Sequence, residues 1–120
     1  MVLQRLGLLV RRAPWCGRSG RDQLDLATAA AALEIELELF FIGDGVLQLL
    51  EQRQPQAAQL PSTHLGWRAL SELTRVRAWA QSGIVSAPLE AAARLLPDIK
   101  FLDAADMQVL QAQCDRVLVL

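Results

Sequence analysis

The chain is 120 residues long, and its twelve basic and thirteen acidic side chains leave a formal net charge of −1. A length of this order suits one domain, so we expect residues 1–120 to form a single unit. The balanced charge excludes a strong overall field that would draw the protein to nucleic acid or to an anionic membrane.

The first third of the chain alternates between strand-like and helix-like segments. Residues 2–10 are short, branched and apolar and end at Arg11 and Arg12, which is typical of a strand. The alanine-dense segment 22–34 predicts a helix. Residues 35–42 predict a second strand, and their solidly apolar end indicates a strand that is covered on both faces.

A Gly-Asp-Gly tripeptide separates the second strand from a further apolar segment, VLQLL. We expect a tight turn in which Asp44 caps a short helix at its N-terminus. Two glycines at a helix start can also offer backbone N–H groups to an anion. Neither GxGxxG nor GxxxxGK[ST] surrounds them, however, and the Asp44 carboxylate would repel phosphate. The tripeptide is therefore interpreted as a turn and not as a phosphate site.

The remainder of the chain continues the same alternation. We expect a helix capped by Ser62 or Thr63 that carries Trp67, and a helix capped by Asp103 before the last strand. A further helix is expected at 87–97, where Pro97 ends it. The remaining strands are expected at 75–81, 99–102 and 115–120.

Five strands alternating with helices predict an α/β fold. We expect a single-domain three-layer sandwich, with a five-stranded, mostly parallel sheet in the flavodoxin-like order 2-1-3-4-5 and helices on both faces. Ligands and partners of such sheets gather at the carboxyl ends of the strands. Those ends are expected at 11–20, 43–45, 81–83 and Asp103.

The composition is more apolar than usual for so short a chain. Apolar residues make up 52% of it before glycine is counted, against a usual ~45–50% with glycine included. Either the core is rich in alanine and leucine, or the surplus is buried against partner subunits. No apolar run reaches the ~18–20 residues of a membrane helix. The N-terminal charges do not precede the apolar stretch as in a signal peptide, so we expect a cytoplasmic protein.

The stretch WCGRS places Cys16 between the first strand and the first helix. It matches the redox motif WCxxC with Ser19 in place of the second cysteine. A thiol near a helix start and beside Arg18 and Arg21 would favour the reactive thiolate, so a sulfur carrier or reductase acting through Cys16 is one hypothesis. Against it, a thioredoxin-like domain needs an antiparallel hairpin, which the alternating pattern does not predict.

The other candidate groups predict no second site. Cys114 precedes the last strand and is interpreted as a small buried hydrophobe. His64 has no acid or cysteine nearby in sequence, so it is interpreted as solvated. Arg75 and Arg77 share one face of a strand, which we expect to meet solvent or an acidic partner. No metal and no cofactor are expected.

Three stretches together resemble the DsrE/DsrF-like sulfur-relay family, and within it the TusC/DsrF branch. The shared features are an A-P loop after the first strand, an apolar strand running into F-[FI]-x-D-G-V-x-Q-L, and a last strand closing on [CY]D-x-[VI]. The second feature is the most specific, and the resemblance covers essentially the whole chain. The stretches are RRAPWCGRSGRDQLDLATAAAAL, LELFFIGDGVLQLL and CDRVLVL.

The resemblance implies a parallel α/β domain that assembles with TusB-like and TusD-like subunits into a heterohexamer. Such complexes pass persulfide sulfur between proteins. The Tus set feeds 2-thiolation of the wobble uridine in certain tRNAs, and the Dsr set serves dissimilatory sulfur oxidation. We expect an indirect link to the tRNA thiolation machinery, with the equivalent subunit of a sulfur-oxidation complex as the alternative.

The resemblance also implies a subunit that is not an enzyme. The family's catalytic subunit type carries its persulfide cysteine at the end of the third strand, where this chain has Ala80. Alanine cannot form a persulfide, and members of this branch are regarded as lacking the transferring cysteine and acting structurally. The expected subunit contacts are Phe41, Asp44, Val46, Leu47, Leu50 and Trp67.

Overall fold

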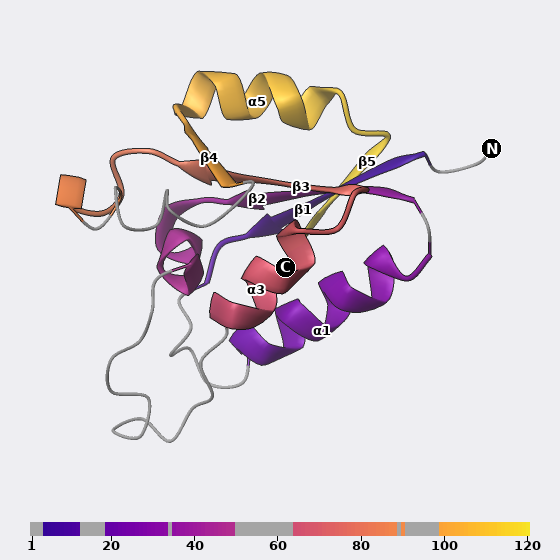
Figure 1. Cartoon of the computed structure of the whole chain (residues 1–120). Helices are drawn as coiled ribbons and strands as arrows, with labels where there is room; N and C mark the ends of the chain where they lie inside the picture. The colour runs from indigo at the N-terminus through magenta and orange to yellow at the C-terminus, as the bar shows by residue number, and fades with distance from the viewer. Residues whose placement is uncertain (1–3, 13–18, 34, 50–63, 89, 91–98) are drawn as a thin grey trace.

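The computed structural model describes residues 4–12, 19–33, 35–49, 64–88, 90 and 99–120. One sheet lies between two layers of helix, with α1 and α3 on one face and α5 on the other (Figure 1). Within these ranges, no helix is long and apolar enough to cross a membrane. The elements in chain order are β1 (Arg5–Val10), α1 (Ser19–Ala31), β2 (Glu36–Phe41), the 3₁₀ helix η1 (Gly43–Leu49), α3 (His64–Ser71), β3 (Val76–Gln81), β4 (Ile99–Leu102), α5 (Ala104–Ala112) and β5 (Arg116–Val119).

The strands lie where the apolar segments predict them, with small differences at their ends. Asp103 caps α5 as expected, because its side chain accepts a hydrogen bond of 2.8 Å from the Asp106 N–H. Ser62 and Thr63, the predicted caps of α3, lie outside the described residues. The predicted helix at 87–97 also falls largely outside them.

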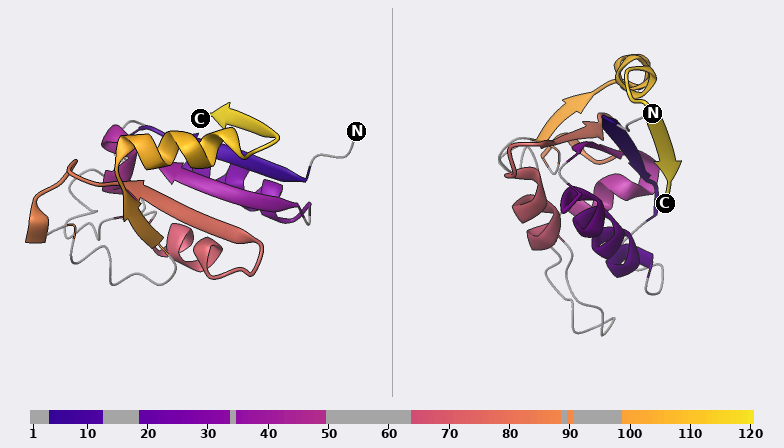
Figure 2. Two further views of the ribbon diagram at one scale, coloured as in Figure 1. Left: turned by 90° about the horizontal axis from the view of Figure 1, so that it is seen from above. Right: turned by 90° about the vertical axis from the view of Figure 1, so that its right-hand side faces the viewer.

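The parallel five-stranded sheet with helices on both faces is confirmed, but the predicted strand order 2-1-3-4-5 is wrong. The observed order is β4-β3-β2-β1-β5, and every neighbouring pair is parallel. In the right-hand view of Figure 2, β4 (orange) and β5 (yellow) lie at the two edges of the sheet with α5 above it.

The packing of α1 against α3 explains the difference in order. Right-handed crossovers put their helices on the same face when successive strands are added in the same direction. Leu24 of α1 lies against Gly66 of α3 so closely that a Cβ at Gly66 would collide with the leucine side chain. The two helices therefore share a face, and β3 must lie beyond β2. The predicted order would have reversed direction after β2 and separated them.

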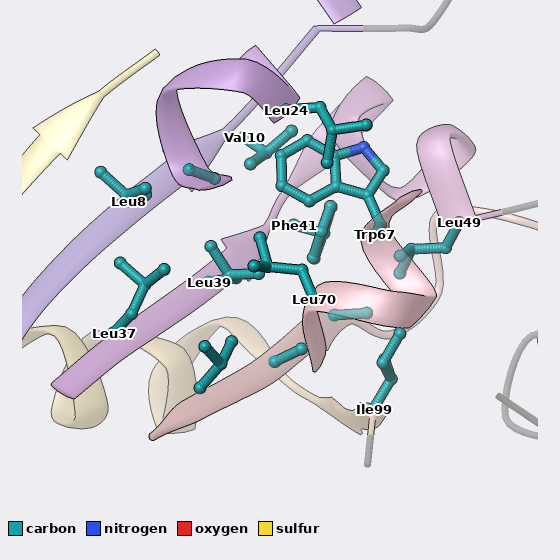
Figure 3. Close-up of a cluster of buried hydrophobic side chains, with 14 of the residues drawn as sticks. Leu8, Val10, Leu24, Leu37, Leu39, Phe41, Leu49, Trp67, Leu70 and Ile99 are labelled. Atoms are coloured by element: carbon teal, nitrogen blue, oxygen red, sulfur yellow. The ribbon is translucent and has the colours of Figure 1, made fainter. Parts of the chain in front are cut away.

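The main core lies between the sheet and the α1/α3 layer. Leu8, Leu39 and Phe41 point into it from the strands, and Trp67 reaches it from α3 (Figure 3). The Phe41 and Trp67 rings meet edge to face, with centroids 5.1 Å apart and an interplanar angle of 88°. On the opposite face, Phe40 and Met107 are buried. Both sheet faces are therefore covered in part, as the apolar β2 segment predicts.

Candidate functional site at the carboxyl edge of the sheet

The carboxyl ends of β1 and β2 are joined directly through the backbone. The Ile42 N–H donates to the Val10 carbonyl at 3.0 Å, and η1 begins at the next residue. The end of β3 meets the same edge, because the Gly43 N–H donates to Gln81 Oε1 at 3.0 Å. Segments from three strands thus come together where α/β folds place their sites.

The two glycines of the Gly-Asp-Gly turn serve different purposes. Gly43 has a φ of 52°, in the left-handed region that favours glycine. Gly45 packs its backbone on the end of β1, and a Cβ there would collide with the Val10 carbonyl. The tripeptide therefore turns the chain sharply and lets η1 rest directly on β1.

Asp44 is exposed and lies inside the first turn of η1, which begins at Gly43. It is therefore not the N-cap that the sequence predicts. Its carboxylate still lies at the positive end of a helix, where a negative charge is favoured. As a subunit contact, Asp44 stays a prediction.

The predicted contact set needs correction. Phe41, Val46 and Trp67 each have 0% of their surface exposed within the single chain. A side chain without exposed surface has none to lose to a partner, so these three belong to the core. Leu47 is half-buried and still available to a partner, and Leu50 lies outside the described residues. Apolar patterning alone does not separate a core position from an interface position, because both are apolar.

A buried polar network links four segments beneath this edge. Gln48 of η1 donates from Nε2 to the Arg12 carbonyl at 3.0 Å and to Gln23 Oε1 at 3.1 Å. Its Oε1 accepts from Trp67 Nε1 at 2.8 Å. Gln48 is fully buried, and Gln23 nearly so. Gln48 is not among the residues predicted from the sequence, although a lone glutamine inside VLQLL is a signal for a buried polar group with partners.

Ala80 lies in β3 with its side chain fully buried in the main core. It is paired with Phe41 of β2 and Phe101 of β4 in the sheet register. A methyl group at this place offers no nucleophile and no metal ligand. Its equivalence to the family's persulfide cysteine stays a prediction. Cys16 lies outside the described residues.

Cys114 is half-buried and hydrogen-bonded, which corrects its interpretation as a small buried hydrophobe. Its thiol donates to Glu38 Oε2 at 3.3 Å and lies 3.7 Å from the Leu110 carbonyl oxygen. Burial raises the pKa of Cys114 to about 12, and the hydrogen bond and charge of Glu38 act in the same direction. Arg77 Nη1 lies 3.8 Å from the other Glu38 oxygen, so the acidic partner predicted for the Arg77 face belongs to the chain itself.

An apolar patch occupies the free edge of β5. Leu26 of α1 is 47% exposed, and Leu118 and Val119 of β5 are 40% and 54% exposed. Beside them is a hollow of about 330 Å³. Its lining residues are Arg12, Asp22, Gln23, Leu26, Val119 and Leu120. Among the described residues, no group of three or more His, Cys, Asp or Glu side chains is placed to hold a metal ion.

Comparison with known proteins gives a consistent set of relatives. The profile of the DsrE/DsrF-like family matches residues 4–120. The TusC homolog of Aliivibrio fischeri is 31% identical over 123 residues, covering 98% of this chain and 99% of that protein. Protein TusC of Klebsiella pneumoniae is 40% identical over 55 residues, 46% of each chain. The crystal structure of the ychN protein from E. coli has the same fold, with a TM-score of 0.75 at 19% identity, covering 98% of this chain and 100% of that one.

Proposed function

This chain belongs to the DsrE/DsrF-like family, and we propose on that basis that it is a non-catalytic structural subunit of a sulfur-relay complex. In such a complex persulfide sulfur passes from one protein to the next, and this subunit would hold a cysteine-bearing sister subunit in place. The similarity to proteins called TusC, one of them over almost its full length, supports this role.

The residue at the end of β3 is the observation that carries the proposal. The sequence holds two cysteines, Cys16 and Cys114, and neither belongs to β3. The last core-facing side chain of β3 is the buried methyl group of Ala80. A persulfide needs a thiolate to accept the sulfur. A subunit without a thiol there would contribute through shape and contact.

We propose further that the complex serves 2-thiouridine formation at the tRNA wobble position. The TusC names of the relatives favour this pathway over dissimilatory sulfur oxidation. The expected partners are TusB-like and TusD-like subunits in a cytoplasmic heterohexamer, with an indirect link to the tRNA thiolation machinery. The near-zero net charge agrees with an absence of direct nucleic-acid contact.

The β5 edge is the described surface that best suits a sister subunit. An edge strand leaves one row of backbone N–H and C=O groups open to pairing, and proteins usually protect such edges with charge or proline. β5 carries one exposed charge, Arg116 at its start. Its Leu118 and Val119 are apolar and exposed, and Leu26 extends the patch onto α1. Of the predicted contact set, Asp44 and Leu47 on η1 are the described residues that still have surface to offer a partner.

Co-expression tests the proposal. The tagged chain is expected to co-purify with two small homologous subunits in a fixed ratio. Its deletion is expected to remove 2-thiouridine from the tRNA pool, as measured by mass spectrometry of digested tRNA. Purified alone and incubated with a sulfurtransferase and its sulfur source, the chain is expected to gain no sulfur in its intact mass. A stable monomer that accepts sulfur would contradict the proposal.

The alternative function acts through Cys16. It is favoured by one observation: α1 begins at Ser19, three residues after this cysteine. A thiol so close to a helix start would react quickly with alkylating agents below neutral pH. Rapid labelling at about pH 6 that is lost in Cys16→Ser would support a sulfur carrier or reductase. Slow labelling would remove this alternative.

A further inference from the structure

Cys114 lies on the α5 face of the sheet, where it meets a nearly buried carboxylate. Its thiol donates to Glu38 Oε2 at 3.3 Å. Glu38 is 2% exposed and stands on β2, 76 residues away in the sequence. The contact is therefore a product of the fold and not of local geometry.

The two oxygens of Glu38 have different partners. Oε1 lies 3.8 Å from Arg77 Nη1, and Oε2 accepts the thiol. Arg5 on β1 is directed mainly to Glu36, with Nη2 2.9 Å from Oε2 of that residue. The Asp115 carboxylate accepts from the backbone N–H of Arg5 at 2.8 Å. The thiol therefore contacts one carboxylate directly, and the charges of Arg5 and Asp115 also act on it.

The sulfur is also confined by the sheet beneath it. A Cβ added to Gly7 of β1 would lie 3.1 Å from Cys114 Sγ and 3.1 Å from Phe40 Cε2. A side chain at this position would press on the thiol and on Phe40, so the glycine gives the sulfur its room against the sheet. The Leu110 carbonyl, 3.7 Å away, closes the side towards α5.

These surroundings oppose ionisation of the thiol. Burial raises the pKa of Cys114 to about 12, the hydrogen bond and charge of Glu38 add to the increase, and Arg5 works against it. The contact therefore holds the proton on sulfur.

We propose that Glu38 is a specificity-determining residue that keeps Cys114 out of sulfur exchange, so that sulfur carried by a sister subunit is not diverted to this chain. The inference rests on the proposed sulfur-relay function. Diversion would require the Cys114 thiolate to attack the outer sulfur of a persulfide. A new S–S bond would form on Cys114, the donor's S–S bond would break, and the donor would leave as a thiolate. A protonated thiol does not begin this step.

The test uses the full chain in a Cys16→Ser background, where Cys114 is the sole thiol. Iodoacetamide alkylation is followed by mass spectrometry from about pH 7 to about pH 10. Native Cys114 is expected to react at least about tenfold more slowly than the same thiol in urea. Glu38→Gln is expected to raise the native rate at about pH 8 at least about tenfold and to shift the rate profile to lower pH. Glu36→Gln, an exposed acid on the same face, is the matched control and is expected to leave the rate unchanged.

The same variants are then incubated with inorganic polysulfide as the sulfur donor. Only Glu38→Gln is expected to gain the mass of one sulfur atom at Cys114. Glu38→Leu is a second variant with no carboxylate. The Arg77 side chain is 60% exposed, so removing Glu38 leaves no buried unpaired charge on that residue. Equal native and urea rates for Cys114 would overturn the proposal. So would folded Glu38 variants whose rates match the Glu36→Gln control. Both readouts use the isolated chain, so they are independent of whether it co-purifies with sister subunits.

Discussion

Gln48 shows how one polar residue organises the carboxyl edge. Its amide joins the end of β1, α1, η1 and α3 through bonds to Arg12, Gln23 and Trp67. Buried amides are costly unless both their donors and their acceptors are satisfied. The sequence shows a glutamine in an apolar run but not its partners, which lie up to 36 residues away. The network could therefore be suspected from the sequence but not assigned.

Gln48→Leu is expected to destabilise the fold by about 2–4 kcal/mol, because it leaves the Trp67 N–H and Gln23 Oε1 buried without this partner. Gln108→Leu, at an exposed position of α5, is the matched control and should change stability by no more than about 0.5 kcal/mol. Urea denaturation followed by tryptophan fluorescence measures both. Equal effects in the two variants would show that the network contributes nothing.

The two turn glycines are expected to differ in their tolerance of a methyl group. Gly43→Ala should cost about 1–2 kcal/mol, because φ is 52° but no atom stands within 4 Å of the added carbon. Gly45→Ala should cost about 3 kcal/mol or prevent folding, since the added carbon would collide with the Val10 carbonyl. Thermal unfolding by circular dichroism compares them. A milder effect at Gly45 would contradict the close approach of η1 to β1.

Cys114 is expected to make the free energy of unfolding fall at alkaline pH. Its pKa is raised from 9.0 to about 12 in the folded chain, so the unfolded chain loses the thiol proton first as pH rises. The contribution of the protonated thiol to the stability of the folded chain is therefore fully present below about pH 9 and is lost progressively up to about pH 12. Cys114→Ala is expected to show a shallower fall in stability over this window than the wild type. Urea midpoints at several pH values measure the difference, and parallel curves would contradict it.

At the scale of elements, β5 differs from the other edge strand. Side chains on both of its faces are exposed, including Leu118 and Val119, whereas β4 buries Ile99. Each of the two strands carries one exposed basic residue, Arg116 on β5 and Lys100 on β4. The apolar run DRVLVL predicted the strand correctly. It could not show that the strand lies at an edge, because a short apolar run looks the same in the centre of a sheet.

Val119→Lys is expected to weaken assembly with sister subunits, because it would bury a charge in the subunit contact that we propose for the β5 edge. Leu33→Lys is the control: Leu33 is 70% exposed and lies in the turn after α1 and not on β5. Size-exclusion chromatography of co-expressed subunits distinguishes them. Loss of the complex in Leu33→Lys but not in Val119→Lys would place the contact elsewhere.

At the scale of the molecule, the sequence predicted the alternation of strands and helices and failed on their order. Apolar runs and caps such as Asp103 are local signals, and they located the elements well. Strand order depends on which helices share a face, and that was decided by the fit of Leu24 against Gly66. The contact prediction failed for Phe41, Val46 and Trp67 for a related reason: distance from the surface is a property of the assembled layers.

The isolated chain is expected to self-associate at micromolar concentration. Leu26, Leu118 and Val119 leave an apolar patch beside an open strand edge, and such surfaces are usually covered in a stable protein. Static light scattering should give a mass above 13.2 kDa for the isolated chain. A sharp monomer peak across the concentration range would count against a subunit role.

Strands β2 to β4 are added on one side of β1, and β5 is added on its other side. This order also affects how the chain folds as it leaves the ribosome. β1, the first strand made, obtains its second neighbour only when the last of the five strands has emerged. Until then its outer row of amides stays open, and a nascent chain in this state can pair with other unfinished copies. Timely binding of that edge by β5, or by a chaperone before it, would decide the yield of soluble protein.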